Sequence, residues 1–546
     1  MTSNRFRAPL ALRLILPATL LLAGCGGKEA PVADAGAPAS ATDHAEDGIP
    51  WFQGSVEEAF ALAKQERRPV FLYWGAVWCP PCHALRTRLF TRPEFARRLS
   101  ETVAVYLDGD TERAQIWGEK LGTYGYPTVI VFDADGQEVT RIASLLAFEE
   151  YAEVLSRALD ATRPIREVVA AAESGGPASL PPAELNLLAF YSFGQDRTLD
   201  LDDARSRALF ERLWRETPAD RPVEKTRFFS LYLQTLAGEE DAQPLSPAER
   251  DELAAGLTAL LADRAAVATN FDLVLYGAGD VVRRLAPEPG PDRDALVDAW
   301  VRTARTLEAD ETLTVDDRLS ALLPQIEISL LDRTEEGATP PADLQARVRE
   351  RVRWAAGTVT DENEMQAVMS TMAGLLEDAG LADEARTLLA EKLGTTVAPY
   401  YYQSWLGGLE AKAGNNETAV ARYREAWQGA RATHTGAAMT PFRWGYSYLS
   451  RVLSLTPEAS AAVRDDGSAV LADLLASPDA FAGGNWSRLE ALASKLDSWA
   501  GEDPARGEVV DALRNQVRAR CDRFDDAGED SAQARCRSFL AGEPSA

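Results

Sequence analysis

Two hydrophobic patterns divide the chain. Between residues 51 and 160, short apolar runs such as "VFLYW" and "TVIVF" alternate with segments that place apolar residues at helical spacing. Runs of this length, bounded by polar and turn residues, are typical of buried strands. From about residue 163 the strand signals stop, and Ala, Leu, Arg and Glu dominate segments of helical period. The pattern predicts an α/β domain followed by a large all-α region.

The α/β domain is expected to alternate its elements. Strands are predicted at 69–75 and 102–108, and a hairpin is predicted at 128–143 around an Asp-Gly turn. Helices are predicted before, between and after these strands. Ser55 and Glu58 have the spacing of a capping box, which would start the first helix. The expected order is α-β-α-β-α-β-β-α.

The segments outside the α/β domain differ in composition. Residues 1–24 combine a basic start, "MTSNRFR", with the short apolar run "LILPATLLLAG", which predicts an export signal. Residues 25–50 are rich in Ala, Pro, Gly and Asp and predict a flexible tether. We therefore expect the α/β domain over 51–162 and the helical region over 163–546. No other segment has 18 uncharged apolar residues, so no transmembrane helix is expected.

Part of the helical region repeats. Gly380 and Gly414 are 34 residues apart, and so are Ala385 and Ala419. The surrounding segments resemble the helix pairs of tetratricopeptide proteins, whose repeat has this length. The resemblance implies an α-solenoid-like array with degenerate repeats. Irregular helical packing is the alternative, because two weak repeats are few for a stable stack.

The charge of the chain limits its partners. It carries 84 acidic residues against 57 Lys and Arg, a formal net charge of −27. A chain of this charge repels phosphate backbones, so nucleic acid is not an expected partner. The acids do not gather at metal-ligand spacing, and we expect them to solvate the surface. Neither a metal nor another cofactor is predicted.

The candidate chemistry lies in "WCPPCH", which contains Cys79, Cys82 and His83. Cys-x-x-Cys is typical of a redox dithiol, whereas Cys-x-x-Cys-His is also typical of covalent haem attachment. A haem would need a sixth ligand, and the chain has five Met and three His in all. The motif also follows a predicted strand, whereas haem domains of this type are small and helical. We therefore favour the dithiol.

Trp78 and the cysteines directly follow a predicted strand, and Tyr126-Pro127 directly precedes the hairpin. With these two motifs, residues 51–160 resemble the thioredoxin superfamily. The resemblance implies a thioredoxin-like fold in which the peptide bond before Pro127 is cis and faces the dithiol. It also implies that the backbone of Tyr126 pairs with an extended substrate. Trp78 is expected to pack beside the site and shield it.

The position of Cys79 at a helix start predicts its role. Backbone N–H groups and the positive helix end stabilise a thiolate there, so we expect Cys79 to have a lowered pKa and to be exposed. Cys79 would attack a substrate disulfide, and the more shielded Cys82 would resolve the mixed disulfide. Pro80 and Pro81 supply no N–H donors and stiffen the turn.

The motif departs from thioredoxin at two positions. Thioredoxins keep a buried Asp six residues before the first cysteine, where this chain has Tyr73, and the usual Lys on the next strand is also missing. The proton-transfer group is therefore unassigned. His83 either tunes the thiolates or faces solvent on its helix. We favour the second interpretation.

Cys521 and Cys536 flank a short polar segment near the C-terminus. Two short helices with a turn at Gly528 would bring them together. Beyond Cys25 the chain has four cysteines, and an even number in an exported chain permits disulfides. We expect a structural disulfide here, with a second redox pair reduced by the first as the alternative.

The end of the signal segment, "LLAGC", resembles the lipobox of bacterial lipoproteins. The resemblance implies that Cys25 is lipidated and that the protein is anchored in the cell envelope, facing the periplasm. Gly26, where some lipoproteins have an Asp that retains them in the inner membrane, favours the outer membrane.

These features together predict an extracytoplasmic thiol–disulfide oxidoreductase. Its expected partners are protein thiols or disulfides and a redox partner, and the helical region would select among them. The alternative is an envelope-binding lipoprotein whose thioredoxin-like domain mainly serves for docking. In either case the aromatic stretch "YYYQSW" is a candidate partner surface.

Overall fold

The computed structural model describes residues 48–111, 113–123, 125–142, 146, 148–161, 163–238, 244–333, 337–434, 439–477, 479–521 and 531–541. The predicted signal segment, Cys25 and nearly all of the predicted tether lie outside these residues, as does the turn predicted at Gly528. None of the helices in the described ranges is both long and apolar enough to span a membrane.

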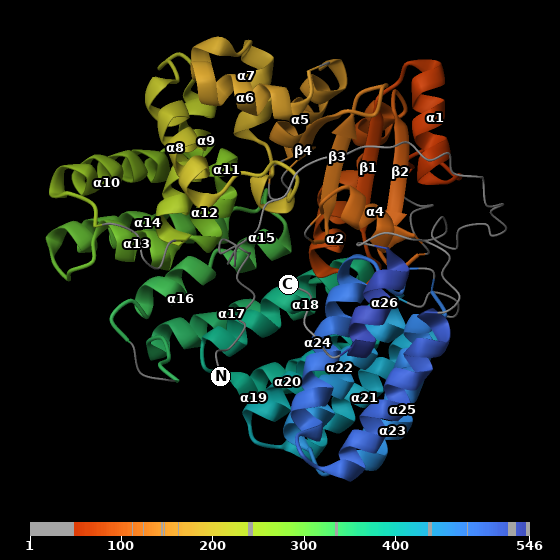
Figure 1. Cartoon of the computed structure of the whole chain (residues 1–546). Helices are drawn as coiled ribbons and strands as arrows, with labels where there is room; N and C mark the ends of the chain where they lie inside the picture. Colours follow the sequence, from red (N-terminus) through yellow and green to blue (C-terminus); the bar gives the residue numbers. More distant parts are fainter. Residues whose placement is uncertain are drawn as a thin grey trace.

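A four-stranded mixed sheet in the order β2-β1-β3-β4 forms the centre of the α/β domain (Figure 1). Its strands are β1 (Val70–Gly75), β2 (Val103–Asp108), β3 (Thr128–Phe132) and β4 (Glu138–Ile142). β1 runs parallel to β2 and antiparallel to β3, and β3 is antiparallel to β4. All four strands lie within the predicted ranges. β1 and β3 are continuous apolar runs, as expected of strands that are buried on both faces.

Helices cover both faces of this sheet. They are α1 (Val56–Glu66), α2 (Pro80–Leu85), α3 (Pro93–Leu99), α4 (Ala114–Lys120) and α5 (Phe148–Asp160), with a π-helical turn η3 (Arg86–Phe90) between α2 and α3. Successive side chains of β1 point to opposite faces. Val70, Leu72 and Trp74 therefore pack with α1 and α4. Phe71 and Tyr73 enter the larger core, which α2, α3 and α5 cover.

The rest of the described chain is helical. The helices are α6 (Ile165–Gly175), α7 (Pro182–Ala189), α8 (Asp203–Glu216), α9 (Pro222–Gly238), α10 (Pro247–Ala262), α11 (Arg264–Thr269), α12 (Phe271–Tyr276), α13 (Ala278–Leu285), α14 (Pro291–Ala309), α15 (Val315–Ser320), α16 (Leu323–Ser329), α17 (Ala342–Thr358), α18 (Glu362–Asp378), α19 (Ala382–Lys392), α20 (Pro399–Lys412), α21 (Asn416–Thr433), α22 (Met439–Leu455), α23 (Ser460–Leu475), α24 (Gly483–Ala500), α25 (Pro504–Cys521) and α26 (Ala532–Ala541). Short 3-10 helices are η4 (Pro177–Ser179), η5 (Phe193–Gln195) and η6 (Leu393–Thr395).

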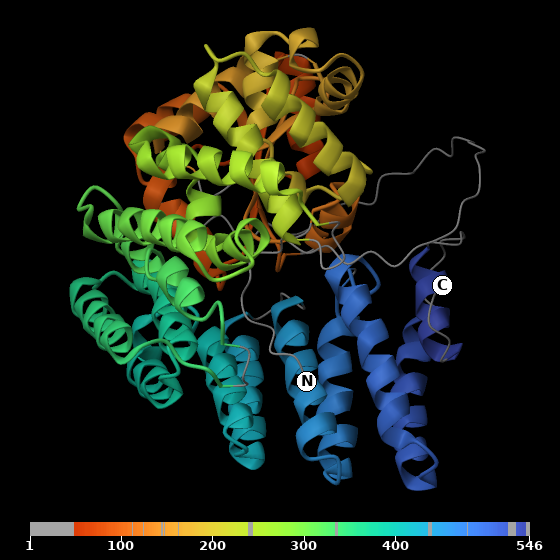
Figure 2. The ribbon, with the colours of Figure 1, turned by 90° about the vertical axis from the view of Figure 1, so that its left-hand side faces the viewer.

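Helices α6 to α14 lie beyond the β4 side of the sheet, and α18 to α26 lie beneath it (Figures 1 and 2). The predicted fold class, an α/β domain followed by a large all-helical region, is confirmed.

The helical region begins directly on the sheet edge. The side chain of Arg141 on β4 is fully buried, forms ion pairs with Glu138 and Asp196, and donates to the carbonyl oxygen of Gln195 at 2.6 Å. The backbone N–H of Ser192 donates to the carbonyl oxygen of Arg141 at 2.9 Å. A buried guanidinium is tolerated when its donors are paired in this way. These bonds hold the first helices against β4, and the apolar core continues across the predicted boundary at residue 162.

The two glycines 34 residues apart have the same structural role. Gly380 follows α18 with a φ of +74°, and Gly414 follows α20 with a φ of +81°. Glycine adopts this left-handed conformation at little cost, which is why it commonly ends helices. Each glycine therefore joins a pair of helices, α18 with α19 and α20 with α21. The 34-residue spacing reflects two consecutive helix pairs.

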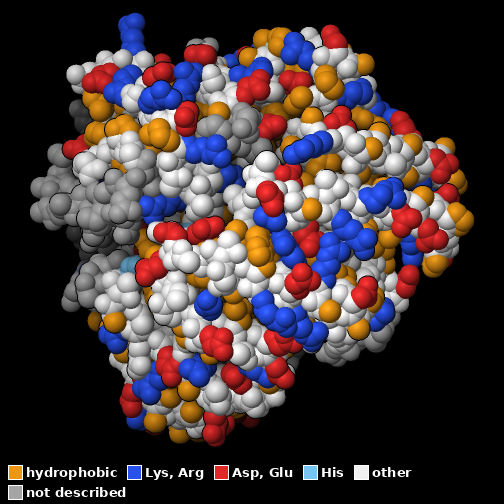
Figure 3. Space-filling model, turned by 180° about the vertical axis from the view of Figure 1, so that it is seen from behind, with side chains coloured by type: hydrophobic (Ala, Val, Ile, Leu, Met, Phe, Trp, Pro, Cys, Tyr) orange, Lys and Arg blue, Asp and Glu red, His pale blue; other side chains and the backbone are white. Residues whose placement is uncertain are grey.

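Acidic and basic side chains are interspersed on the face that Figure 3 shows. Several exposed ion pairs form within one helix, such as Arg212 with Glu216 and Arg215 with Glu211 on α8. Exposed pairs of this kind contribute little to stability. The mixture of signs fits the expectation that the acids solvate the surface.

Candidate functional site

The cysteine motif lies where β1 leads into α2. Cys79 is the residue that precedes α2, and a disulfide joins it to Cys82 with a Cα–Cα distance of 5.2 Å. The backbone N–H of Cys82 donates to Sγ of Cys79 at 3.2 Å. Pro80 and Pro81 occupy the first two helical positions and have no N–H to donate. The first N–H of the helix therefore lies within hydrogen-bond distance of the sulfur of Cys79, and in the reduced form it would stabilise the thiolate.

The loop before β3 lies next to this motif. The peptide bond between Tyr126 and Pro127 is cis. The ring of Tyr126 meets the ring of Trp78 edge-on, with a centroid distance of 5.6 Å. The Trp78 indole N–H donates to Oδ2 of Asp110 at 2.8 Å. The carbonyl oxygen of Pro127 accepts a hydrogen bond of 2.6 Å from Nε2 of Gln195, which belongs to the helical region.

His83 and Tyr73 are both buried. The prediction that His83 faces solvent is wrong: it is 7% exposed, because α18 covers α2. Nε2 of His83 lies 2.5 Å from the carbonyl oxygen of Val77, so the imidazole contacts the loop that precedes the motif. Tyr73 stacks on Tyr106 and meets Phe90 edge-on. At this position an aromatic core residue replaces the acid of thioredoxins.

The two cysteines are covered. Cys79 is 2% exposed and Cys82 is 4% exposed, so the prediction of an exposed Cys79 is wrong. The physical reason is the docking of the helical region over the motif. Tyr401 stacks on the ring of Trp78, with an interplanar angle of 14°, and Trp444 meets the same ring edge-on. Tyr401 belongs to the aromatic stretch "YYYQSW" that was predicted as a partner surface. In the structure it contacts the cysteine motif of the same chain.

Comparisons with known proteins agree with this geometry. The family model for a thioredoxin-like domain matches residues 56–159. These residues form a thioredoxin-like domain. Thiol:disulfide interchange protein DsbD of Cronobacter sakazakii is 35% identical over 81 residues, and that of Yersinia enterocolitica is 34% identical over 82 residues. Each alignment covers 14% of this chain and 14% of the relative.

A solved structure named DsbH oxidoreductase also aligns with the chain. It has 19% sequence identity and a TM-score of 0.19, and the alignment covers 25% of this chain and 96% of that one. The chain spans only about a seventh of the length of the curated relatives, whose alignments cover 14% of each. The family model concerns the thioredoxin-like domain and does not extend into the helical region.

Hydrogen bonds and an ion pair fix the docking of α18 and α15 on the thioredoxin-like domain. Nε2 of Gln366 on α18 donates to the carbonyl oxygen of Trp78 at 2.9 Å. Arg88 on η3 forms a buried ion pair with Asp317 on α15. Nη1 of Arg86 donates to Oδ1 of Asn363 at 3.1 Å. These partners are separated by more than two hundred residues in the sequence, which is why no local signal predicted them.

A second contact joins α4 of the thioredoxin-like domain to the C-terminal helices. Both oxygens of Asp479 accept backbone hydrogen bonds of 2.8 Å, one from Arg113 and one from Gln115. Asp479 thus satisfies N–H groups at the start of α4 from across the interface. Glu119 pairs with Arg535 of α26, which lowers the pKa of Glu119.

Charged groups flank the ring of Trp78. The guanidinium of Arg443 lies 4.1 Å from the ring centroid, a cation–π distance. Burial and, after it, the charge of Arg443 lower the pKa of Arg488 to about 9. Burial also raises the pKa of Tyr126, and the charge of Asp110 adds to that effect. The helical region therefore places the cation of Arg443 over the ring of Trp78, whose indole N–H is bonded to Asp110.

The remaining chemistry predicted from the sequence lies elsewhere. A disulfide joins Cys521 on α25 to Cys536 on α26, with a Cα–Cα distance of 5.5 Å, and both residues are buried. Nε2 of His434 lies 2.7 Å from the hydroxyl of Tyr400. Within the described residues, no group of three His, Cys, Asp or Glu side chains is placed to hold a metal ion.

Proposed function

We propose that the protein is a thiol–disulfide oxidoreductase that acts on protein cysteines through Cys79 and Cys82. The observation that carries this proposal is the disulfide at the start of α2, with a helix N–H directed at Sγ of Cys79. The match of residues 56–159 to the thioredoxin-like family model and the name of the DsbD relatives, thiol:disulfide interchange protein, support it.

The proposed exchange balances in sulfur and electrons. In the reduced protein, the Cys79 thiolate attacks a substrate disulfide, forms a mixed disulfide and releases one substrate thiolate. The Cys82 thiolate then attacks Sγ of Cys79 and releases the second substrate thiolate, which leaves the Cys79–Cys82 disulfide. Two electrons pass to the substrate, whose thiolates take up protons according to their pKa. The reverse sequence oxidises a substrate dithiol.

The covered position of Cys79 gives the helical region a second role in this proposal. A protein substrate needs its sulfur in line with Sγ of Cys79, and a residue that is 2% exposed offers no room for that approach. We therefore propose that exchange follows movement of the helical region away from Trp78. A partner that binds the helical region would favour this opening. The helical region would thereby determine which proteins exchange disulfides with Cys79.

Cysteine variants test the proposal. Cys79→Ala should abolish disulfide reductase activity, and Cys82→Ala should accumulate mixed disulfides that non-reducing gels and mass spectrometry detect. The double variant Cys521→Ala/Cys536→Ala is the matched control, because it removes the other cysteine pair and should keep the activity. Full activity in Cys79→Ala would contradict the catalytic assignment.

A second candidate function is a binding protein whose thioredoxin-like domain serves for docking. The burial of Cys79 and Cys82 favours it, because a covered disulfide can act as a purely structural cross-link. Dithiothreitol treatment of the native protein distinguishes the two. A redox-active pair should become reduced while the protein stays folded, whereas a structural pair should resist reduction until unfolding.

We propose further that the protein is anchored in the cell envelope through lipidated Cys25 and faces the periplasm, with the outer membrane as its location. The signal segment and its "LLAGC" end support this. Cell fractionation after labelling with a palmitate analogue checks it, since Cys25→Ala should lose the label and leave the membrane fraction.

A further inference from the structure

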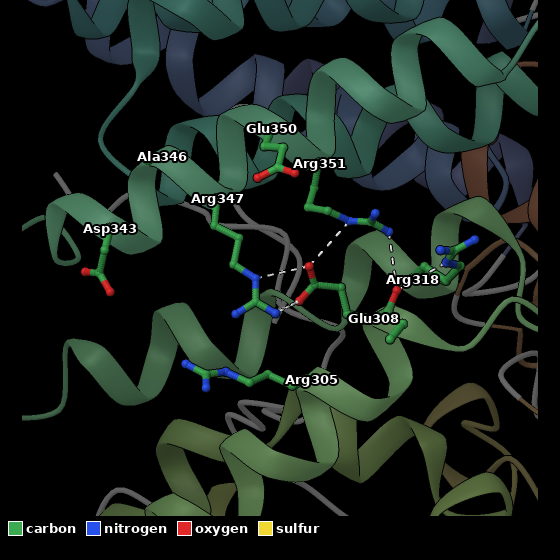
Figure 4. Close-up of a pocket in the computed structure, with 9 residues that line it drawn as sticks. Arg305, Glu308, Arg318, Asp343, Ala346, Arg347, Glu350 and Arg351 are labelled. Atoms are coloured by element: carbon green, nitrogen blue, oxygen red, sulfur yellow. Dashed lines mark hydrogen bonds and ion pairs between the residues drawn. The ribbon is translucent and has the colours of Figure 1, made fainter.

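A charged cavity of about 430 Å³ lies on the helical region, where α14, α15 and α17 meet (Figure 4). The residues that line it are Arg305, Glu308, Ala309, Arg318, Asp343, Ala346, Arg347, Glu350 and Arg351. Four arginines thus meet three acids at one cavity, in a chain whose net charge is strongly negative. Neither the sequence patterns nor the comparisons assign a role to this place.

Two of the arginines pair with a single buried carboxylate, and a third bonds to the backbone of the same residue. The side chain of Glu308 is 7% exposed. Nε of Arg347 donates to its Oε1 at 3.1 Å, and Nε of Arg351 lies 3.4 Å from the same oxygen. Nε of Arg318 donates to the backbone oxygen of Glu308 at 3.2 Å. One carboxylate cannot neutralise three guanidinium groups, and partly buried charges need compensation. Burial lowers the pKa of Arg351, and this effect, together with the charges of Arg318 and Arg347, outweighs the opposing charges of Glu308 and Glu350.

The other two acids supply only part of that compensation, because water screens the effect of Glu350 on Arg351. Asp343 and Glu350 are both exposed to water, and Figure 4 shows Asp343 at the opposite end of the cavity from Arg318. Arg305, which is also exposed, adds a fourth cation from α14, and it has no hydrogen bond or ion pair with any residue in the described part of the chain. The cavity therefore presents surplus positive charge and guanidinium donors.

The orientation of two guanidinium groups is fixed in advance. Those of Arg318 and Arg351 lie 4.6 Å and 4.0 Å from the ring centroid of Trp354. Stacking on an aromatic ring holds the planar fork of an arginine in place, so less side-chain entropy is lost when an anion binds. This arrangement is favourable for an anion with several oxygens.

We propose that this cavity binds a small phosphate-bearing ligand. A phosphate dianion accepts paired hydrogen bonds from more than one guanidinium and neutralises two charges, whereas a single carboxylate neutralises one. The volume lies within the range of about 300–1,000 Å³ that is common for small-molecule sites, which leaves room for an organic group beside the phosphate. The inference concerns the helical region alone and does not depend on the redox proposal.

Calorimetric titration of the full chain with inorganic phosphate and with glycerol 3-phosphate, at constant ionic strength, tests this. We expect saturable binding of at least one of them at millimolar concentration or below, and weaker binding of succinate. Tighter binding of glycerol 3-phosphate would identify an organic phosphate as the ligand, and tighter binding of inorganic phosphate would identify the free anion.

Variants locate the binding. Arg305→Gln should weaken phosphate binding by at least about five-fold, because it removes a charged donor at the cavity. Arg318→Gln should weaken it as well. Arg353→Gln is the matched control: it makes the same charge change at an exposed position of α17 outside the cavity. Absence of binding by the unmodified chain, tighter binding of succinate, or equal effects of Arg305→Gln and Arg353→Gln would overturn the proposal.

Discussion

Gln366 links the helical region to the backbone of the cysteine motif. Its Nε2 donates to the carbonyl oxygen of Trp78 at 2.9 Å, and its Oε1 accepts from the backbone N–H of Ala398 at 3.2 Å. The residue is completely buried. Gln366→Glu keeps the shape and the acceptor for Ala398 but places an oxygen against the carbonyl of Trp78. The substitution therefore weakens docking while it keeps the hydrogen bond inside the helical region.

The size of the effect follows from the lost hydrogen bond. A buried carbonyl that loses its donor costs about 1–3 kcal/mol. Because about 1.4 kcal/mol corresponds to a factor of ten, the equilibrium between docked and undocked forms should shift by about five- to a hundred-fold. If Cys79 reacts only in the undocked form, its rate of alkylation rises by the same factor.

The assay is the rate of iodoacetamide alkylation of Cys79 in the reduced, native protein, followed by mass spectrometry. Gln234→Glu is the control, since it places a carboxylate at another buried glutamine that contacts Ser230 and Asp272 within the helical region. It should lower stability and leave the alkylation rate of Cys79 near that of the unmodified protein. If Gln366→Glu leaves that rate unchanged although it lowers stability, docking does not protect Cys79.

Three further predictions concern stability, each measured by urea unfolding. Burial raises the pKa of Asp316 to about 6, so the folded state binds the carboxyl proton more tightly than the unfolded state does. The stabilisation that results is complete below about pH 4 and is lost as the pH rises through about 6. Asp316→Asn should therefore raise the free energy of unfolding by about 1–3 kcal/mol at pH 7.5, and a pH-independent difference would contradict this. Arg88→Met should cost about 3–5 kcal/mol because it leaves the buried Asp317 carboxylate without its cation, and adding Asp317→Leu should restore most of the loss. The variant Cys521→Ser/Cys536→Ser should lose about 3 kcal/mol, and an unchanged free energy of unfolding would exclude a stabilising cross-link.

Local sequence was sufficient for the elements of the thioredoxin-like domain. The continuous apolar runs predicted β1 and β2, because a strand buried on both faces cannot carry polar residues at alternate positions. The capping box of Ser55 and Glu58 forms as predicted at the start of α1. The cysteine spacing and the position of Pro127 identified the candidate site, because these features depend on residues that are neighbours in the chain.

Only the tertiary structure decided how exposed that site is. Cys79 was predicted to be exposed because its own segment places it at a helix start, and nothing within that segment indicates a cover. The cover comes from residues such as Gln366 and Tyr401, several hundred positions away. The arginine cavity likewise combines three helices that no shared motif connects. Sequence periodicity reports which face of an element is buried, whereas the partner that buries it depends on complementary side chains brought together by the whole fold.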